Sequence, residues 1–270
     1  MPELPESVVI ARQMDRLLRT KIVASVAISQ SKCLNRDEAD YYRLLPGQLI
    51  DRVVHLGKWI VIGFESGDRL LISLGMGGEI LQLAPGAALP DKSRMHVRFN
   101  DETGFYITFW WFGYVHLALK GEAHAMTDAL GPDPLTLSVG QFRDLLSGRR
   151  GGVKTFLLNQ KRICGIGNFY IQEILFRARL HPLRSIPSLS QAEIAELYRA
   201  IRDVLQQSID LGSSSYELDF LGEKGQFDLQ KLSIAYQENA VCPVCGARAE
   251  KIQTGSTSQF ICPFCQPLNP

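Results

Sequence analysis

Met1-Pro2-Glu3-Leu4-Pro5-Glu6 is the stretch around which this 270-residue chain is organised. Apolar residues follow it at helical spacing and predict one helix that ends near Thr20: Val8, Ala11, Met14, Leu17 and Leu18. Proline in the first turn and glutamate near the positive end of the helix dipole are typical of a helix start. The plainest interpretation of the stretch is therefore an N-terminal helix.

The same residues could also carry chemistry. Removal of Met1 would leave Pro2 with a secondary amine at the N-terminus. Because an α-amino group titrates near ~8, a useful fraction of it is neutral and nucleophilic at physiological pH. Such an amine can attack a sugar or carbonyl carbon and form a Schiff base, while Glu3, the next residue, moves the proton. These six residues alone leave both interpretations open.

After the helix the pattern changes to short runs rich in β-branched residues, several of them separated by turn signals. The expected strands are Ile22–Ser29, Leu49–His55, Lys58–Glu65, Arg69–Leu74, Glu79–Leu83, Met95–Asn100, Phe105–Phe109 and Tyr114–Leu119. About eight antiparallel strands predict a β-sandwich with the first helix packed on it, and hence an α+β fold.

A connector rich in Gly, Pro and Asp, residues 130–134, marks a boundary, and beyond it the chain becomes helical. The expected helices are Val139–Leu146, Val153–Asn159, Asn168–Leu180 and Gln191–Leu211. Residues 212–225 are rich in Gly and Ser and predict a mobile loop. We therefore expect three domains: a β-sandwich at 1–130, a helical domain at 131–225 and a cysteine-rich domain at 226–270.

Four cysteines near the C-terminus form the pattern Cys242-x2-Cys245-x16-Cys262-x2-Cys265. Two such pairs match a zinc ribbon, in which four thiolates complete a tetrahedral site. Two disulfides are the alternative, and a reducing compartment disfavours them. A site of four thiolates leaves no position for water, so we expect one structural zinc and no catalytic metal.

The composition is that of a soluble globular protein, with 46% hydrophobic and 21% charged residues. No apolar run approaches the ~20 residues of a membrane span, and no signal-peptide pattern opens the chain. We expect a cytoplasmic protein without a membrane partner.

The net charge of +1 identifies no partner, but residues 141–184 hold nine Lys or Arg against Asp144 and Glu173. That excess is either a surface that faces phosphates or an ordinary solvated face.

Three further stretches stand out. Leu74-Gly75-Met76-Gly77-Gly78 places Met76 at a glycine-flanked tip between strands, where it is either a core residue or exposed. Phe109-Trp110-Trp111-Phe112-Gly113 has more aromatic residues than one strand face can bury, so some should be exposed or cover a ligand. Gln160–Tyr170 contains a glycine-rich turn before a helix, with Asn168 near the helix start. That turn is either a phosphate seat or an ordinary Asn cap.

Five motifs occur in order: Pro-Glu-Leu-Pro-Glu at 2–6, Gly57-Lys58, Leu74-Gly75-Met76, Gly165-Ile166-Gly167-Asn168-x-Tyr170 and the four-cysteine ribbon. On these motifs the chain resembles the formamidopyrimidine-DNA glycosylase/endonuclease VIII family of base-excision repair enzymes from Pro2 to Gln266. Each motif alone is weak, but five in order at family-like spacing are specific. The family's β-sandwich, helix–two-turn–helix domain and zinc finger agree with the elements predicted above.

The resemblance implies a bifunctional DNA glycosylase and AP lyase that acts on damaged duplex DNA. Pro2 would attack C1′ of the damaged nucleotide, Glu3 would protonate the sugar, and Glu6 would support the N-terminal arrangement. Lys58 and Asn168 would grip the phosphates beside a flipped nucleotide. The catalytic candidates are thus Pro2, Glu3, Glu6 and Lys58, and the DNA-binding candidates are Met76, Trp110, Phe112, Lys154, Lys161, Asn168 and Tyr170. We expect a nucleoid-associated monomer.

The chain departs from the family pattern at DNA-facing positions. Where the family's intercalation loop carries arginine for the estranged base, this chain has Trp110, while Met76 and Phe112 still match the positions that fill the stack. A guanidinium offers five hydrogen-bond donors and an indole one, so reading of the opposite base should weaken. At the position of the arginine in the family's zinc finger this chain has Thr257. At the position of the family's histidine before Leu-Gly-Met it has Ser73. These changes favour altered substrate choice, and we expect activity on single-stranded or bubble DNA.

Two other functions compete with this reading. A non-catalytic or weakly catalytic relative could recognise distorted or single-stranded DNA through the aromatic loop at 109–112. A zinc-ribbon interaction module without a DNA role would explain neither the N-terminus nor the basic segment. Covalent trapping on abasic DNA separates the first alternative from an active enzyme, because only a Schiff base can be trapped.

Overall fold

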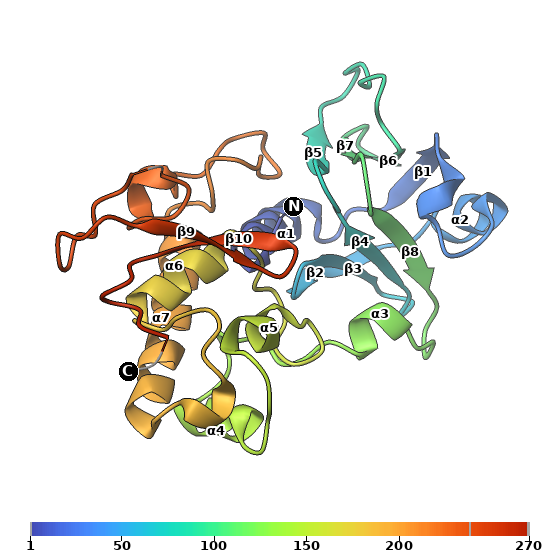
Figure 1. The fold of residues 1–270 in the computed structure, drawn as a ribbon. Coiled ribbons are helices and arrows are strands. Elements are labelled where there is room, and N and C mark those ends of the chain that lie inside the picture. The colour runs from blue at the N-terminus through green and yellow to red at the C-terminus, as the bar shows by residue number, and fades with distance from the viewer. Residues whose placement is uncertain (1, 238, 269–270) are drawn as a thin grey trace. The chain divides into compact units, whose positions relative to one another are not determined.

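The computed structural model describes residues 2–237 and 239–268, which fall into two compact units (Figure 1). Unit 1 consists of Met1–Ala129 with Gly212–Gln226, and unit 2 of Leu130–Leu211 with Phe227–Pro270. This division differs from the three predicted domains in two ways. The segment 212–226 belongs with the N-terminal strands, and the cysteine-rich segment belongs with the helices.

Unit 1 opens with helix α1 (Leu4–Leu18), followed by two antiparallel four-stranded sheets. One sheet has the order β1-β6-β7-β5 and the other β2-β3-β4-β8. The strands are β1 (Val23–Ile28), β2 (Ile50–Leu56), β3 (Trp59–Phe64), β4 (Arg69–Ser73), β5 (Glu79–Leu83), β6 (Met95–Phe99), β7 (Gly104–Thr108) and β8 (Tyr114–Ala118). Each end lies within one residue of its expected bound, so the predicted strands are confirmed. Short helices α2 (Glu38–Leu44) and α3 (Ala125–Asp128) and the 3-10 turn η1 (Ser31–Cys33) complete the unit.

One hydrophobic core joins the two sheets and the first helix. Alternate residues of the strands point inward, as the pattern of buried and half-buried residues along β6 shows. Met14 and Leu18 of α1 enter the same cluster as Val97 and Ile107 of one sheet and Ile62 of the other. The helix packs on β2 and β3. The first helix is therefore part of the sandwich, and its N-terminus is held in place by it.

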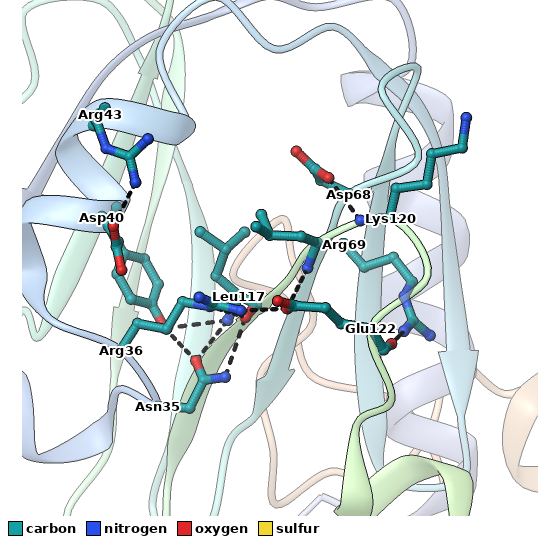
Figure 2. Close-up of polar contacts among 11 residues, drawn as sticks. Asn35, Arg36, Asp40, Arg43, Asp68, Arg69, Leu117, Lys120 and Glu122 are labelled. Atoms are coloured by element: carbon teal, nitrogen blue, oxygen red, sulfur yellow. Dashed lines mark hydrogen bonds and ion pairs between the residues drawn. The ribbon is translucent and has the colours of Figure 1, made fainter.

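Strand β8 lies at the edge of its sheet, and side chains cover that edge (Figure 2). Asn35 accepts a hydrogen bond from the Leu117 N–H at 2.8 Å and donates one to the Leu117 carbonyl at 3.1 Å. Arg36 donates to the same carbonyl at 3.0 Å and forms an ion pair with Glu122. Arg69 donates to the Glu122 backbone carbonyl at 2.8 Å. Because the outward N–H and carbonyl of Leu117 are satisfied by these side chains, a second strand has little to pair with at that point of the edge.

The described residues of unit 2 form four α-helices and a C-terminal hairpin. The elements are α4 (Val139–Leu146), α5 (Val153–Leu158), α6 (Tyr170–Arg177), α7 (Gln191–Asp210), the 3-10 turns η2 (Ile186–Ser188) and η3 (Leu229–Lys231), and strands β9 (Glu250–Thr254) and β10 (Thr257–Ile261). Helix α7 begins with a capping box: Ser190 Oγ accepts from the Glu193 N–H, and the Glu193 carboxylate accepts from the Ser190 N–H.

The cysteine-rich hairpin shares a core with helix α6. Phe176 of α6 lies in one hydrophobic cluster with Ile234, Phe260 and the buried cysteines 242 and 262. The Gln172 side chain accepts a hydrogen bond from the Phe260 N–H at 3.1 Å. The hairpin is therefore not an independent domain, and its strands need the helix to bury their apolar face.

The segment 212–226 is a structured hairpin, which corrects its prediction as a mobile loop. Phe220 is fully buried in the core of unit 1, and its carbonyl accepts the Gln82 N–H at 3.0 Å. Gln13 of α1 holds the segment twice, donating to Asp219 Oδ2 at 2.6 Å and accepting from the Phe220 N–H at 2.9 Å. Glycine and serine content predicted flexibility, but the buried Phe220 ring and the two hydrogen bonds from the half-buried Gln13 side chain outweigh it.

In the described part of the chain, every helix is too short or too polar to cross a bilayer.

Candidate active site

The N-terminus of α1 is built around one carboxylate. Glu6 accepts a hydrogen bond from the Glu3 N–H at 2.8 Å through one oxygen and from the Ser214 N–H at 3.1 Å through the other. Glu3 is the N-cap residue, and Pro2, Glu3 and Glu6 are all buried. Both interpretations of the opening stretch are thus compatible: the residues start a helix, and the same capping contacts fix Pro2 beside a carboxylate.

A further carboxylate, Glu217, was missed by sequence reasoning and lies on the hairpin 212–226. The hairpin is tied to α1 at Ser214 and at Asp219, on either side of Glu217. Burial raises the pKa of Glu217, and the negative charges of Glu6 and Glu79 raise it further. A carboxyl in such surroundings holds its proton to higher pH than usual. No spacing rule in the sequence connects residue 217 with residue 6.

Lys58 occupies the tip of the tight turn between β2 and β3. Leu56 and Trp59 pair as the last residues of the two strands, so the turn consists of Gly57 and Lys58 alone. Gly57 adopts φ +57°, which glycine reaches without strain. The half-buried Lys58 side chain therefore projects from a fixed position in unit 1.

Met76 and the aromatic loop 109–112 form one exposed apolar patch in unit 1. Met76 is paired with Trp111: its N–H donates to the Trp111 carbonyl at 2.8 Å, and the Trp110 N–H donates to the Met76 carbonyl at 3.2 Å. Trp110, Trp111 and Phe112 are 65%, 65% and 69% exposed. The expected exposure within this aromatic stretch is therefore confirmed for residues 110–112, and Met76 is not a core residue.

Glycines make the close approach of these two loops possible. A Cβ at Gly75 would lie 2.2 Å from the Trp111 carbonyl oxygen, and one at Gly113 would lie 2.2 Å from the buried Phe109 ring. Lys92 lies over Trp110, with Nζ 5.6 Å from the ring centroid. The patch is thus held by backbone pairing, with Phe109 buried beneath it and the rings of residues 110–112 exposed.

In unit 2, the glycine-rich turn presents Asn168 and Lys161 to solvent. Helix α6 begins at Tyr170 with Phe169 as N-cap, so Asn168 is not the helix cap that the alternative reading proposed. Asn168 is exposed, and its backbone carbonyl accepts the Tyr236 hydroxyl at 2.9 Å. Tyr170, predicted to bind DNA, is instead fully buried, with its hydroxyl 2.6 Å from Ser208 Oγ. It supports the turn from behind.

Lys154 also differs from its prediction as a surface contact. Its side chain is buried, and its ammonium donates to Thr254 Oγ1 at 2.6 Å and to Thr257 Oγ1 at 3.2 Å. Burial lowers its pKa. A periodicity argument could not foresee this, because the partners lie about 100 residues further along the chain.

The four C-terminal cysteines come together as predicted. Their Sγ atoms all lie within 4.8 Å of one another, with 3.7 Å between Cys242 and Cys265 and 3.4 Å between Cys245 and Cys262. Four thiolates about 2.3 Å from one ion would be separated by about 3.8 Å, so the set fits a tetrahedral metal site. These S···S distances are well above the ~2.05 Å of a disulfide bond, which excludes the disulfide alternative.

Sequence comparison finds the same protein family along the chain. The family description "Formamidopyrimidine-DNA glycosylase N-terminal domain" matches residues 1–110, and "Formamidopyrimidine-DNA glycosylase H2TH domain" matches residues 130–219. A formamidopyrimidine-DNA glycosylase of Chloroflexus aggregans is 33% identical over 276 residues and covers 99% of both chains. One of Xanthomonas euvesicatoria is 32% identical over 281 residues, covering 98% of this chain and 100% of that protein.

Solved structures agree in fold. Wild-type Lactococcus lactis Fpg (MutM) in complex with DNA containing N7-benzyl-Fapy-dG has a TM-score of 0.89 at 25% identity, covering 98% of this chain and 100% of that chain. Lactococcus lactis Fpg with DNA containing an abasic site has a TM-score of 0.89 at 24% identity, covering 98% and 99%. The likeness therefore includes both units and the cysteine-rich hairpin.

Proposed function

The chain belongs to the formamidopyrimidine-DNA glycosylase family, and on that premise we propose that it is a base-excision repair DNA glycosylase with AP lyase activity whose nucleophile is Pro2. The observation that carries the proposal is the buried N-terminus of α1, where the Glu6 carboxylate fixes Glu3 beside Pro2. The non-catalytic alternative is not favoured, because it leaves this buried arrangement without a use.

The residues divide the chemistry as follows. The Pro2 amine attacks C1′, the glycosidic bond breaks, and the base leaves with the bonding electron pair and takes up a proton. Glu3 protonates the ring oxygen O4′, the C1′–O4′ bond breaks with its electron pair going to that oxygen, and the nitrogen lone pair forms the Schiff base with C1′. The Schiff base acidifies the hydrogens on C2′, so loss of one of them expels the 3′ phosphate. Glu6 holds the N-terminal turn in place throughout.

Borohydride trapping on abasic DNA tests this proposal. Reduction of a Schiff base should fix the protein covalently to the DNA, Pro2→Gly should weaken the trapped band, and an N-terminal extension should abolish it. Mass spectrometry of the N-terminus shows whether Met1 has been removed. A trapped band that survives the extension would move the nucleophile to a lysine, with Lys58 the first candidate.

We further propose that the four clustered cysteines hold one structural zinc ion. Their S···S distances fit a tetrahedral thiolate site, and the buried Cys242 and Cys262 belong to the core shared with α6. Metal analysis should find close to one equivalent of zinc, and chelation should disorder the hairpin and weaken DNA binding. Metal-free protein that binds DNA normally would contradict this role.

We propose that the enzyme acts as a monomer. We also propose that it accepts single-stranded or bubble DNA unusually well. Support comes from the exposed patch of Met76 with the aromatic loop 109–112, because stacking on aromatic rings needs no pairing partner. Excision from a bubble should approach excision from a duplex. Activity confined to fully paired DNA would contradict the proposal.

A further inference from the structure

Unit 2 contains a hollow of about 360 Å³ beside the glycine-rich turn. Its lining residues are Asn168, Gln172, Tyr236, Lys251, Thr257, Ser258 and Phe260. They include one cation, several hydrogen-bonding groups and no carboxylate. A hollow of this composition suits an anion, since every charged group that lines it is positive.

Lys251 is directed over this hollow by the hairpin. It stands opposite Phe260 in the register of β9 and β10, so the two side chains share a face of the hairpin. Its ammonium lies 5.8 Å from the centroid of the Phe260 ring. Phe260 is itself fixed, because its N–H donates to Gln172 on α6. The position of Lys251 therefore follows from the same packing that attaches the hairpin to the helix.

A second cation lies beneath the hairpin turn. The buried Lys154 ammonium donates to the hydroxyls of Thr254 and Thr257, and Thr257 also lines the hollow. In the described part of the chain no ion pair neutralises either Lys154 or Lys251. A buried charge without a counter-ion acts over a longer distance than an exposed one, because water screens it less.

We propose that Lys251 supplies the cationic phosphate contact that this chain lacks at Thr257, and that Lys251 and Asn168 together bind one phosphodiester of the DNA backbone. Lys154 strengthens the positive potential from below. The inference rests on the proposed glycosylase function and names residues of its DNA-binding surface. The family's arginine would stand at the position of Thr257 on β10, whereas Lys251 lies on β9. Both positions line the same hollow.

The test measures equilibrium binding of a duplex with a tetrahydrofuran abasic analogue over a series of salt concentrations. Lys251→Ala should lower the slope of log affinity against log salt by about one, because one fewer phosphate is neutralised. The double variant Lys251→Ala/Thr257→Arg should regain the slope. Arg248→Ala removes an exposed cation from the same ribbon but outside the hollow, and should leave the slope nearer to that of the wild type.

A wild-type slope in Lys251→Ala, or a loss equal to that of Arg248→Ala, would overturn the inference. Zinc content and thermal unfolding of each variant show that the hairpin has remained folded. Failure of the proposed function looks different: the wild-type protein would then form no borohydride-trapped complex. If trapping is intact and only the slope fails to respond, the assignment of Lys251 alone is wrong.

Discussion

Glu6 shows at the scale of one residue how the helix start and the catalytic site are the same structure. One carboxylate oxygen accepts a hydrogen bond from the Glu3 N–H and the other from the Ser214 N–H. Ser214 lies 208 residues further along the chain than Glu6. Hydrogen bonds to an ionised carboxylate are stronger than neutral ones, and here each oxygen accepts one. Its work is to hold Pro2 and Glu3 in position.

We predict that Glu6→Gln weakens trapping more than it weakens folding. An amide keeps one acceptor oxygen but turns an NH2 group toward the second N–H, so one charge-assisted hydrogen bond is lost. The loss should lower the free energy of unfolding by about 1.5–3 kcal/mol. Urea unfolding and the rate of borohydride trapping measure the two effects. A variant that traps at the wild-type rate would show that this contact does not position Pro2.

Trp110 is a second residue with a specific consequence, because it departs from the pattern of the resembled family. It is exposed on a backbone-paired loop, under Lys92, where the resembled family carries an arginine. Base–aromatic stacking contributes about 1–3 kcal/mol per base and tolerates any sequence. Loss of bidentate hydrogen bonding removes a similar amount of discrimination. Affinity can therefore be kept while selectivity for the opposite base is lost.

We predict similar excision rates for one lesion placed opposite each of the four bases, and a restored preference in Trp110→Arg. Single-turnover kinetics on four matched duplexes measure both. Trp111→Arg is the matched control, because it places the same charge on the neighbouring exposed residue. A wild-type enzyme that strongly prefers cytosine opposite the lesion would contradict the stacking account.

At the scale of the element, the hairpin 212–226 is the feature that the structure changes most. Leu218 and Lys224 form an isolated bridge, Phe220 fills the core, and Gln13 clamps Asp219 and Phe220 together. The clamp holds Glu217 within the electrostatic influence of Glu6 and Glu79. An ordered hairpin loses less conformational entropy when substrate binds than a mobile loop would.

We predict that Gln13→Ala loosens this hairpin selectively. Two hydrogen bonds disappear, and a buried N–H of Phe220 loses its partner, which should cost about 1–3 kcal/mol. Hydrogen exchange should accelerate at residues 213–226 and remain slow in β3. Gln48→Ala removes a comparable side-chain bond, to Asp68 at 2.9 Å, away from the hairpin, and serves as control. Unchanged exchange in Gln13→Ala would mean that Phe220 alone anchors the segment.

At the scale of the whole molecule, acid should destabilise unit 1 through a histidine pair. His116 Nδ1 lies 2.8 Å from His124 Nε2, and His124 Nδ1 lies 2.8 Å from Thr127 Oγ1. Burial, and then the nearby His124, lowers the pKa of His116 to about 4. Only one hydrogen fits between the paired nitrogens, so protonation of both rings would set two N–H groups against each other.

The direction of the pH effect follows from that lowered pKa. Below about 6.5 the unfolded chain takes up a proton at His116 that the folded protein refuses until the pH approaches 4. Unfolding is therefore favoured as pH falls through that range. Urea unfolding at several pH values should show a steeper loss of stability in the wild type than in His116→Gln. Parallel curves would show that the pair does not contribute.

The sequence alone was sufficient for the features that depend on local pattern. Short runs rich in β-branched residues, several of them separated by turn signals, predicted the eight strands of unit 1, because both signals are local in the sequence. The starts of α4 and α7 and the cluster of four cysteines followed from short-range spacing in the same way. For Pro2, Glu3, Lys58 and Asn168, motif resemblance supplied the predicted roles.

The tertiary structure decided what depends on contacts between distant parts of the chain. It placed the segment 212–226 in unit 1 through Gln13 and Phe220, buried Lys154 and Tyr170, exposed Trp110, and brought Lys251 to the hollow beside Asn168. Whether a lysine faces water or two threonine hydroxyls is settled by the packing of elements about 100 residues apart. Local composition cannot predict that packing, because the free energy of burial depends on the neighbours that a residue meets in the assembled core and not on the residue alone.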